Sequence, residues 1–144
     1  MSNPQKNLNF GALIERTLRV TKQHFLQLFK ELDIDITTEQ WVLIDFLYQN
    51  DGISQTELAN GSFKNAPTIS RIIDLLKKKE LVIKKQSTED KRQYLIFLTE
   101  KAKALHEKAY PKVLEFRKQG WEGLSYKDYQ QLEKIMNTIF HNFG

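Results

Sequence analysis

The sequence predicts a mainly α-helical chain with one small β-hairpin, and three observations support this fold class. Apolar residues recur at helical spacing over most of the 144 residues. Two apolar runs, residues 81–83 and 94–98, flank a charged stretch, which is the pattern of a hairpin. A helix with a basic outer face, Pro67 to Lys79, comes directly before it. A short helix, a turn, this basic helix and then a hairpin follow the order of a winged helix-turn-helix, an α+β arrangement.

Three helices are expected before the basic one. A long amphipathic helix is predicted over residues 10–32, because apolar residues recur there at helical spacing. Two shorter helices are predicted over residues 38–50 and 54–60, each opened by a side chain that can accept hydrogen bonds from first-turn amides. These N-caps are Thr37 and Ser54, and Gly61 is expected to end the shorter helix.

The last third of the chain is also expected to be helical. Thr99 is placed to cap a helix that runs to residue 121, and Pro111 should kink this helix or divide it into two pieces. Ser125 and Asp128 have capping-box spacing and open a last helix with a strict apolar stripe. The apolar stripes at the two ends of the chain are too rich for the small central module to cover. An intertwined homodimer is therefore expected, with a self-contained monomer as the alternative.

Composition narrows the class of protein. There is no cysteine, which excludes disulfides, thiolate zinc sites and sensing by thiol oxidation. The histidines at positions 24, 106 and 141 are far apart, so neither a metal site nor a cofactor is expected. No apolar run approaches about 20 residues, the length that spans a bilayer, and the first residues lack the pattern of a signal peptide. A cytoplasmic protein without a membrane partner is expected.

The positive charge is concentrated in the centre of the chain. Residues 60–101 hold 10 Lys and Arg against 5 Asp and Glu, whereas the whole chain has 22 against 18. All of the positive excess therefore lies in one segment, as expected for a module that meets phosphates. A solvated basic face without a partner is the alternative.

The basic helix has the residues of a major-groove reader. Its apolar stripe defines an inner side, so Pro67, Arg71 and Lys78 face outward. Short polar side chains near the N-terminus can bond base edges, and an arginine one turn further on can reach guanine. Lysines at the C-terminal end, including Lys79, are better placed for phosphates. The expected DNA contacts on this helix are Asn65, Pro67, Thr68, Ser70, Arg71, Lys77 and Lys78.

The charged tip of the hairpin contains Asp90, Lys91 and Arg92, which complete the expected DNA contacts. Asp90 and Arg92 are two residues apart and could share one side of a strand. A carboxylate beside a guanidinium can hold it as a preset probe for a narrow, electronegative minor groove.

Two motifs resemble the MarR family of bacterial transcription regulators. The wing signature is Asp90-Lys91-Arg92 followed by a strand that ends in Leu98-Thr99. The helix-turn-helix signature is Leu58-Ala59 followed by TISRIID from residue 68. The order of helices matches over nearly the whole chain. One departure is Glu80, which stands where the family often has a glycine after the recognition helix.

The resemblance implies an obligate homodimer whose two winged lobes grip a pseudo-palindromic operator. In it, Arg92 enters the minor groove and is oriented by Asp90, while Ser70 and Arg71 face the major groove. Many members are repressors that a small aromatic ligand releases from DNA. An effector pocket is expected where the lobe meets the dimer helices, and its lining residues are His24, Phe25, Trp41 and Phe46.

Taken together, residues 36–99 are expected to form the DNA-binding lobe, and residues 1–35 and 100–144 the helical dimerisation region of one continuous chain. The expected function is sequence-specific binding of double-stranded DNA as a homodimeric transcription regulator, with a repressor expected in preference to an activator. The alternative is a winged-helix module that binds another protein, such as a co-regulator or an antirepressor. An enzyme is not expected, because the chain has no phosphate-binding loop, nucleophile elbow or catalytic carboxylate pair.

Overall fold

The structure is a computed structural model that describes residues 4–144. Met1 to Asn3, the first residues of the predicted dimerisation region, lie outside the described residues. The chain forms two compact units, of which the first ends at Lys112 and the second is Val113–Gly144. Within the described residues, no helix is long and apolar enough to cross a membrane, and no three His, Asp or Glu side chains are arranged to hold a metal ion.

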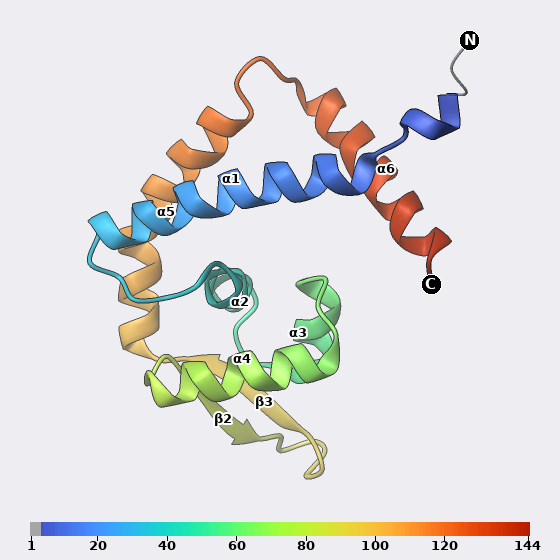
Figure 1. Cartoon of the computed structure of the whole chain (residues 1–144). Coiled ribbons are helices and arrows are strands. Elements are labelled where there is room, and N and C mark those ends of the chain that lie inside the picture. The colour runs from blue at the N-terminus through green and yellow to red at the C-terminus, as the bar shows by residue number, and fades with distance from the viewer. Residues whose placement is uncertain (1–3) are drawn as a thin grey trace. The chain divides into compact units, whose positions relative to one another are not determined.

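The mainly helical class with a small hairpin is confirmed (Figure 1). The first unit contains the strands and most of the helices, and the helix α5 continues from it into the second unit. The helices are η1 (Pro4–Asn7), α1 (Phe10–Glu31), α2 (Thr38–Gln49), α3 (Gln55–Gly61), α4 (Ala66–Lys78), α5 (Glu100–Gly120) and α6 (Tyr126–Asn142). The strands are β1 (Ile53–Ser54), β2 (Val82–Gln86) and β3 (Tyr94–Leu98).

The predicted N-caps form as hydrogen bonds. The Thr37 hydroxyl accepts from the backbone N–H of Gln40 at 3.1 Å, and the Gln40 side chain accepts from the N–H of Thr37 at 3.2 Å. The Asn65 side chain accepts from the N–H of Thr68 at 2.9 Å. Such a cap contributes about 1 kcal/mol, so these local signals determine where α2 and α4 begin. The remaining predicted caps, Ser54, Thr99 and Ser125, also accept from first-turn amides.

The hairpin is part of a three-stranded antiparallel sheet with the order β1-β3-β2. In the hairpin, Val82 pairs with Leu98 and Gln86 with Tyr94. The third strand, β1, was not predicted, because two residues show no alternation of polar and apolar side chains. It pairs Ile53 with Ile96 and thereby joins the wing to the segment between α2 and α3.

The core of the first unit holds α4 in place. The inner side of α4 is at most 1% exposed, as its apolar stripe predicts. It packs with α2, α3 and β2, which contribute their own fully buried side chains. The inner residues of α4 are Ile69, Ile72, Ile73 and Leu76, and Leu43, Ile44, Leu47 and Leu58 belong to α2 and α3. Because this stripe is fixed, the outward direction of every polar residue on α4 is fixed as well.

The apolar stripe of α1 is divided between two environments. Phe25 and Phe29, near its C-terminal end, are buried and contact Trp41 of α2. Leu13 and Leu18, near its N-terminal end, are 57% and 61% exposed. The first half of α1 therefore presents apolar surface that the other elements of the first unit leave uncovered.

Gly61 is the last residue of α3, as expected, and its lack of a side chain also has a packing role. A Cβ at this position would overlap the ring of Phe46 on α2, so any larger residue would require that ring to move. Of the two alternatives expected at Pro111, a kink or a division, the division is wrong, since α5 continues through this residue. Good helix formers on both sides offset the loss of one backbone donor.

At the end of α4, a residue other than glycine takes the left-handed conformation. Glu80 has a φ of 61°, the left-handed conformation that glycine adopts most easily. Its N–H donates to the carbonyl of Lys77 at 3.0 Å, and the N–H of Leu81 donates to the carbonyl of Leu76 at 2.9 Å. These two bonds, with Leu76 and Leu81 both buried, make a Schellman motif. The motif carries the chain from α4 directly into β2.

We expect Glu80→Gly to raise the free energy of unfolding by about 1 kcal/mol, because a Cβ is disfavoured in the left-handed region. Chemical denaturation of the two proteins measures the difference. Glu80→Ala is the matched control, since it removes the same carboxylate but keeps the Cβ. An equal gain in the alanine variant would show that the charge, and not the backbone, is responsible.

Candidate nucleic-acid interface

The outer side of α4 exposes most of the residues that the sequence predicted as DNA contacts. Ser70 and Arg71 are exposed near its N-terminal half, and Lys77 and Lys78 at its C-terminal end. Figure 1 shows α4 beside the β2–β3 hairpin, whose tip projects from the body of the unit. The helix N-terminus also carries the exposed pair Asn65 and Pro67, while Thr68 is half-buried.

Ser70 is held by a side chain from the preceding helix. The amide of Gln55, at the start of α3, donates to the Ser70 hydroxyl oxygen at 3.2 Å. This bond uses the hydroxyl as an acceptor, so its own proton can still be donated to a base or a phosphate. The helix-turn-helix is thus fastened by a polar bond on its outer side as well as by its core.

Arg71 is held in the same way by α2. Its guanidinium donates to a carboxylate oxygen of Glu39 at 3.1 Å, with the two side chains 56% and 42% exposed. The hydrogen bond from Arg71 is the main reason that the pKa of Glu39 lies below its ordinary value, although slight burial opposes it. An exposed pair of this kind contributes little to stability. Its effect is to restrict the directions in which the guanidinium points.

Lys79 has a structural role, which corrects its expected place among the phosphate contacts. Its ammonium donates to the backbone carbonyl of Asp35 and to the side-chain oxygen of Gln40, both at 2.8 Å. Lys79 is half-buried, unlike the two lysines before it. It therefore links the end of α4 to the start of α2.

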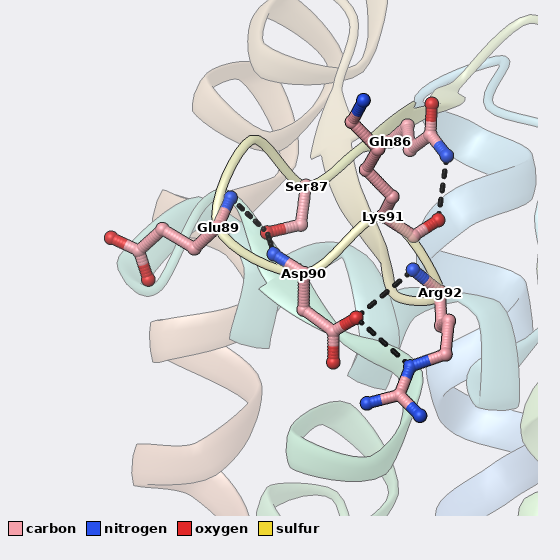
Figure 2. Close-up of polar contacts among 6 residues, drawn as sticks. All are labelled: Gln86, Ser87, Glu89, Asp90, Lys91 and Arg92. Atoms are coloured by element: carbon pink, nitrogen blue, oxygen red, sulfur yellow. Dashed lines mark hydrogen bonds and ion pairs between the residues drawn. The ribbon is translucent and has the colours of Figure 1, made fainter.

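The tip of the hairpin is a hydrogen-bonded turn (Figure 2). The Ser87 hydroxyl accepts from the backbone N–H groups of Glu89 and Asp90 at 3.2 and 3.3 Å. The Gln86 side chain donates to the carbonyl of Lys91 at 2.6 Å. These bonds give the charged loop a defined shape, although most of its side chains are exposed.

Asp90 and Arg92 are brought together at this tip, as Figure 2 shows. One oxygen of Asp90 accepts from the backbone N–H of Arg92 at 3.0 Å and from its Nε at 3.3 Å. The expected pairing is therefore present, but the residues lie in the turn between β2 and β3 and do not share a strand face. The geometry is that of an Asx turn, which orders backbone and side chain together. The Arg92 side chain is still 92% exposed.

Comparison with known proteins shows what this part of the chain is similar to. The model described as MarR family matches residues 36–94, from the end of the α1–α2 connection to the first residue of β3. We refer to this segment as the MarR-family domain, after the family model that it matches. The match includes α4 and the whole tip of the hairpin, the two places where the exposed basic residues gather.

Relatives extend the likeness beyond the MarR-family domain. The HTH-type transcriptional repressor IacR of Pseudomonas putida is 26% identical over 120 residues, which are 83% of this chain and 71% of IacR. The transcription regulator MarR from Oenococcus oeni PSU-1 has a TM-score of 0.80 at 24% identity, over 92% of this chain and 99% of that chain. MepR of S. aureus, in a complex with DNA, has a TM-score of 0.78 at 23% identity, over 94% and 97%. The two structures show that the chain has their fold.

The MarR-family domain contains polar contacts that sequence reasoning missed. Glu39 and Gln55 were not predicted, although they hold the two central residues of α4. Glu39 is 32 residues from Arg71 in the sequence, and Gln55 is 15 residues from Ser70, so no local spacing could reveal either pair. Ser87 could have been noticed, because serine before an acidic pair favours a turn stabilised by its own hydroxyl.

The four residues expected in an effector pocket lie in different surroundings. Phe25 and Trp41 are buried in the core, with ring centroids 6.4 Å apart. Phe46 is half-buried against Gly61, and His24 is exposed on α1. The structure thus brings together two of the four residues, and the pocket itself stays a prediction.

A cavity of about 400 Å³ lies between α2 and α5 beside the MarR-family domain. Its most unusual lining residue is His106, which is 3% exposed and bonds Asp45 through Nε2 at 2.8 Å. The His106 ring stacks on Tyr48, with centroids 3.9 Å apart, and on Trp41 at 5.0 Å. Within the described residues, Nδ1 of His106 and Nε1 of Trp41 are buried without a hydrogen-bond partner. The remaining lining residues are Gln49, Glu107, Tyr110 and Pro111.

We expect Arg71→Ala to raise the pKa of Glu39 toward its ordinary value of 4.5, because the hydrogen bond that favours the carboxylate is lost. NMR titration of the Glu39 side chain measures this shift. Lys22→Ala is the control, since Lys22 is the smallest of the contributions. The small stabilisation from this carboxylate is present above pH 4.5 and is lost as the pH falls through the lowered value. An unchanged pKa in the arginine variant would mean that the ion pair does not persist in solution.

Proposed function

We propose that this chain is a homodimeric repressor that binds a pseudo-palindromic operator in double-stranded DNA. In this proposal residues 36–99 are the DNA-binding lobe, and residues 1–35 and 100–144 hold two copies together. The observation that carries it is the arrangement of Ser70, Arg71 and Arg92. All three are exposed and held by neighbouring side chains on one packed unit. The complex of MepR with DNA and the description of IacR as a repressor support it.

The proposed role of α4 is to read the major groove with its N-terminal half. Arg71 has the length and the paired donors to bond the two acceptors of a guanine, and Ser70 can bond a base edge or a phosphate. The capped N-terminus around Asn65, Pro67 and Thr68 favours a nearby phosphate. The paired lysines at the other end, at positions 77 and 78, neutralise phosphates and so contribute affinity without sequence preference.

The proposed role of the wing is to place Arg92 in the adjacent minor groove. A narrow minor groove has an enhanced negative potential, which attracts a guanidinium without a specific base contact. Asp90 fixes the backbone and the Nε of Arg92, which leaves the terminal nitrogens free to enter the groove. Lys91 is exposed on the same turn and is suited to a flanking phosphate.

The proposed dimer uses the apolar surfaces that the chain leaves exposed. On α1 these are Phe10, Leu13, Ile14 and Leu18. On α6 they are Leu132, Ile135 and Phe140, of which Phe140 is 71% exposed. Burial of apolar surface yields about 25 cal/mol per Å², so two helices of this length can supply a stable interface. A two-fold symmetric dimer would present two lobes to two half-sites about one helical turn apart, roughly 10 bp.

The proposed effector is a small aromatic compound. The cavity between α2 and α5 supports it, because stacked rings of Tyr48 and His106 line one side and Glu107 accepts a hydrogen bond from the Tyr48 hydroxyl at 2.9 Å. That bond raises the pKa of Tyr48 and keeps its hydroxyl protonated. An aromatic ring with a polar substituent matches an apolar wall that has a few convergent polar groups.

We expect Arg92→Ala and Arg71→Ala each to weaken operator binding by about 1–3 kcal/mol, because each removes a groove contact. The operator is first obtained by selection from random duplex DNA, and affinity is then measured at several salt concentrations. Lys30→Ala, on α1, is the control for the loss of one positive charge. Full affinity in the double arginine variant, or binding that does not fall as salt rises, would contradict the proposal.

We expect wild-type protein to sediment as a dimer and Leu13→Glu combined with Leu18→Glu to sediment as a monomer with greatly reduced operator affinity. The reason is that two carboxylates in an apolar interface would be buried without partners. Gln23→Glu, on the polar side of the same helix, is the control and should remain dimeric. A monomeric wild-type protein, or a dimeric double variant, would exclude α1 as the interface.

A further inference from the structure

Phe63, in the turn between α3 and α4, combines two unfavourable features. Its side chain is 90% exposed, the highest value among the large apolar residues of the described chain. Its φ is 59°, a left-handed conformation that is uncommon for a residue with a bulky side chain. The residue therefore exposes an aromatic ring to water and also strains the backbone.

The fold itself does not need this ring. The turn is closed by main-chain bonds, from the N–H of Ser62 to the carbonyl of Leu58 at 3.0 Å and from the N–H of Lys64 to the carbonyl of Ala59 at 3.1 Å. Glycine satisfies such a turn with least strain. Among the described residues, the other non-glycine residues with positive φ are Asp33 and Glu80, whose polar side chains suit an exposed position. Phe63 is the exception, and a strained, exposed residue of this kind suggests a function.

The position of Phe63 indicates its partner. The turn leads directly into the N-terminus of α4, where Asn65 caps the helix and Pro67 is exposed. Lys64 follows Phe63 in the turn, and no other large apolar residue between positions 49 and 74 is exposed. A protein interface would place further apolar residues around it. A duplex instead offers phosphates to the lysine and apolar atoms, namely thymine methyl groups and deoxyribose carbons, to the ring.

We propose that Phe63 is a DNA contact that packs its ring against thymine methyl and deoxyribose carbons at the edge of the major groove, at the base pairs next to those read by α4. The inference rests on the proposed function, since it requires α4 to enter the groove. The contact buries apolar surface in an interface that is otherwise made of charged and polar groups. It also predicts a preference for thymine at one position of each half-site.

Three substitutions separate the ring from the backbone. Phe63→Tyr keeps the ring, Phe63→Ser removes the ring but keeps the strain of a Cβ, and Phe63→Gly removes both. The probe is the duplex recovered by wild-type protein from random-sequence DNA, and its affinity is measured over a range of salt concentrations. Thermal unfolding of each variant without DNA gives the effect on stability.

We expect the serine and glycine variants to bind the selected duplex about tenfold more weakly, and the tyrosine variant to bind within about twofold of wild type. The dependence of affinity on salt should keep its slope, because no phosphate contact is lost. Lys64→Ala is the contrasting variant, since it should lower that slope by about one. The glycine variant alone should melt higher, by about 2–4 °C.

Two results would overturn the inference. One is a serine variant that binds as tightly as wild type, which would show that the ring makes no contact. The other is a loss of affinity confined to the glycine variant, which would assign the effect to the shape of the turn. Wild-type protein that binds no duplex at all would refute the proposed function itself, and this result is distinct from the other two.

Discussion

The structure depends on the burial of one side of α4. Ile69, Ile72, Ile73 and Leu76 have almost no exposed surface, because α2, α3 and β2 close over them. Removing one such side chain would cost several kcal/mol, about 2–5 for a buried isoleucine or leucine cut to alanine. This packing fixes the rotation of α4 about its axis, and so it fixes the side from which the polar residues of α4 project. The residues proposed to read DNA can therefore be short and exposed, since the helix beneath them does not move independently.

Three exposed polar pairs restrict the directions of side chains on the surface of the packed unit. Each pair is a hydrogen bond between an outward side chain and a neighbouring one. The pairs are Arg71 with Glu39, Ser70 with Gln55 and Arg92 with Asp90. Pairs with this much solvent around them add little to stability. Their consequence is geometric, because a restricted side chain loses less conformational entropy when it binds a groove. The same unit accepts backbone strain where glycine would be easier, at Glu80 and Phe63.

Local signals explain which elements were predictable. The capping pattern from Thr37 to Gln40 and the Asn65 cap involve neighbours three residues apart, and both formed as expected. The features that local signals missed concern interactions with distant segments. Gly61 ends α3 as expected, but only the structure shows that the Phe46 ring of another helix occupies the space beside it. Likewise, β1 exists because β3 pairs with it. No periodicity within either segment contains that information.

The sequence by itself determined the helices, the hairpin, the basic segment and the Asp90–Arg92 pair, because each arises from residues within a few positions of one another. Only the tertiary structure decided which partner restrains Arg71 and Ser70, that Lys79 forms hydrogen bonds within the fold, and which half of α1 is buried by the first unit. These outcomes depend on contacts between helices that are far apart in the chain. Their geometry is set by the packed core, which no short stretch of sequence specifies alone.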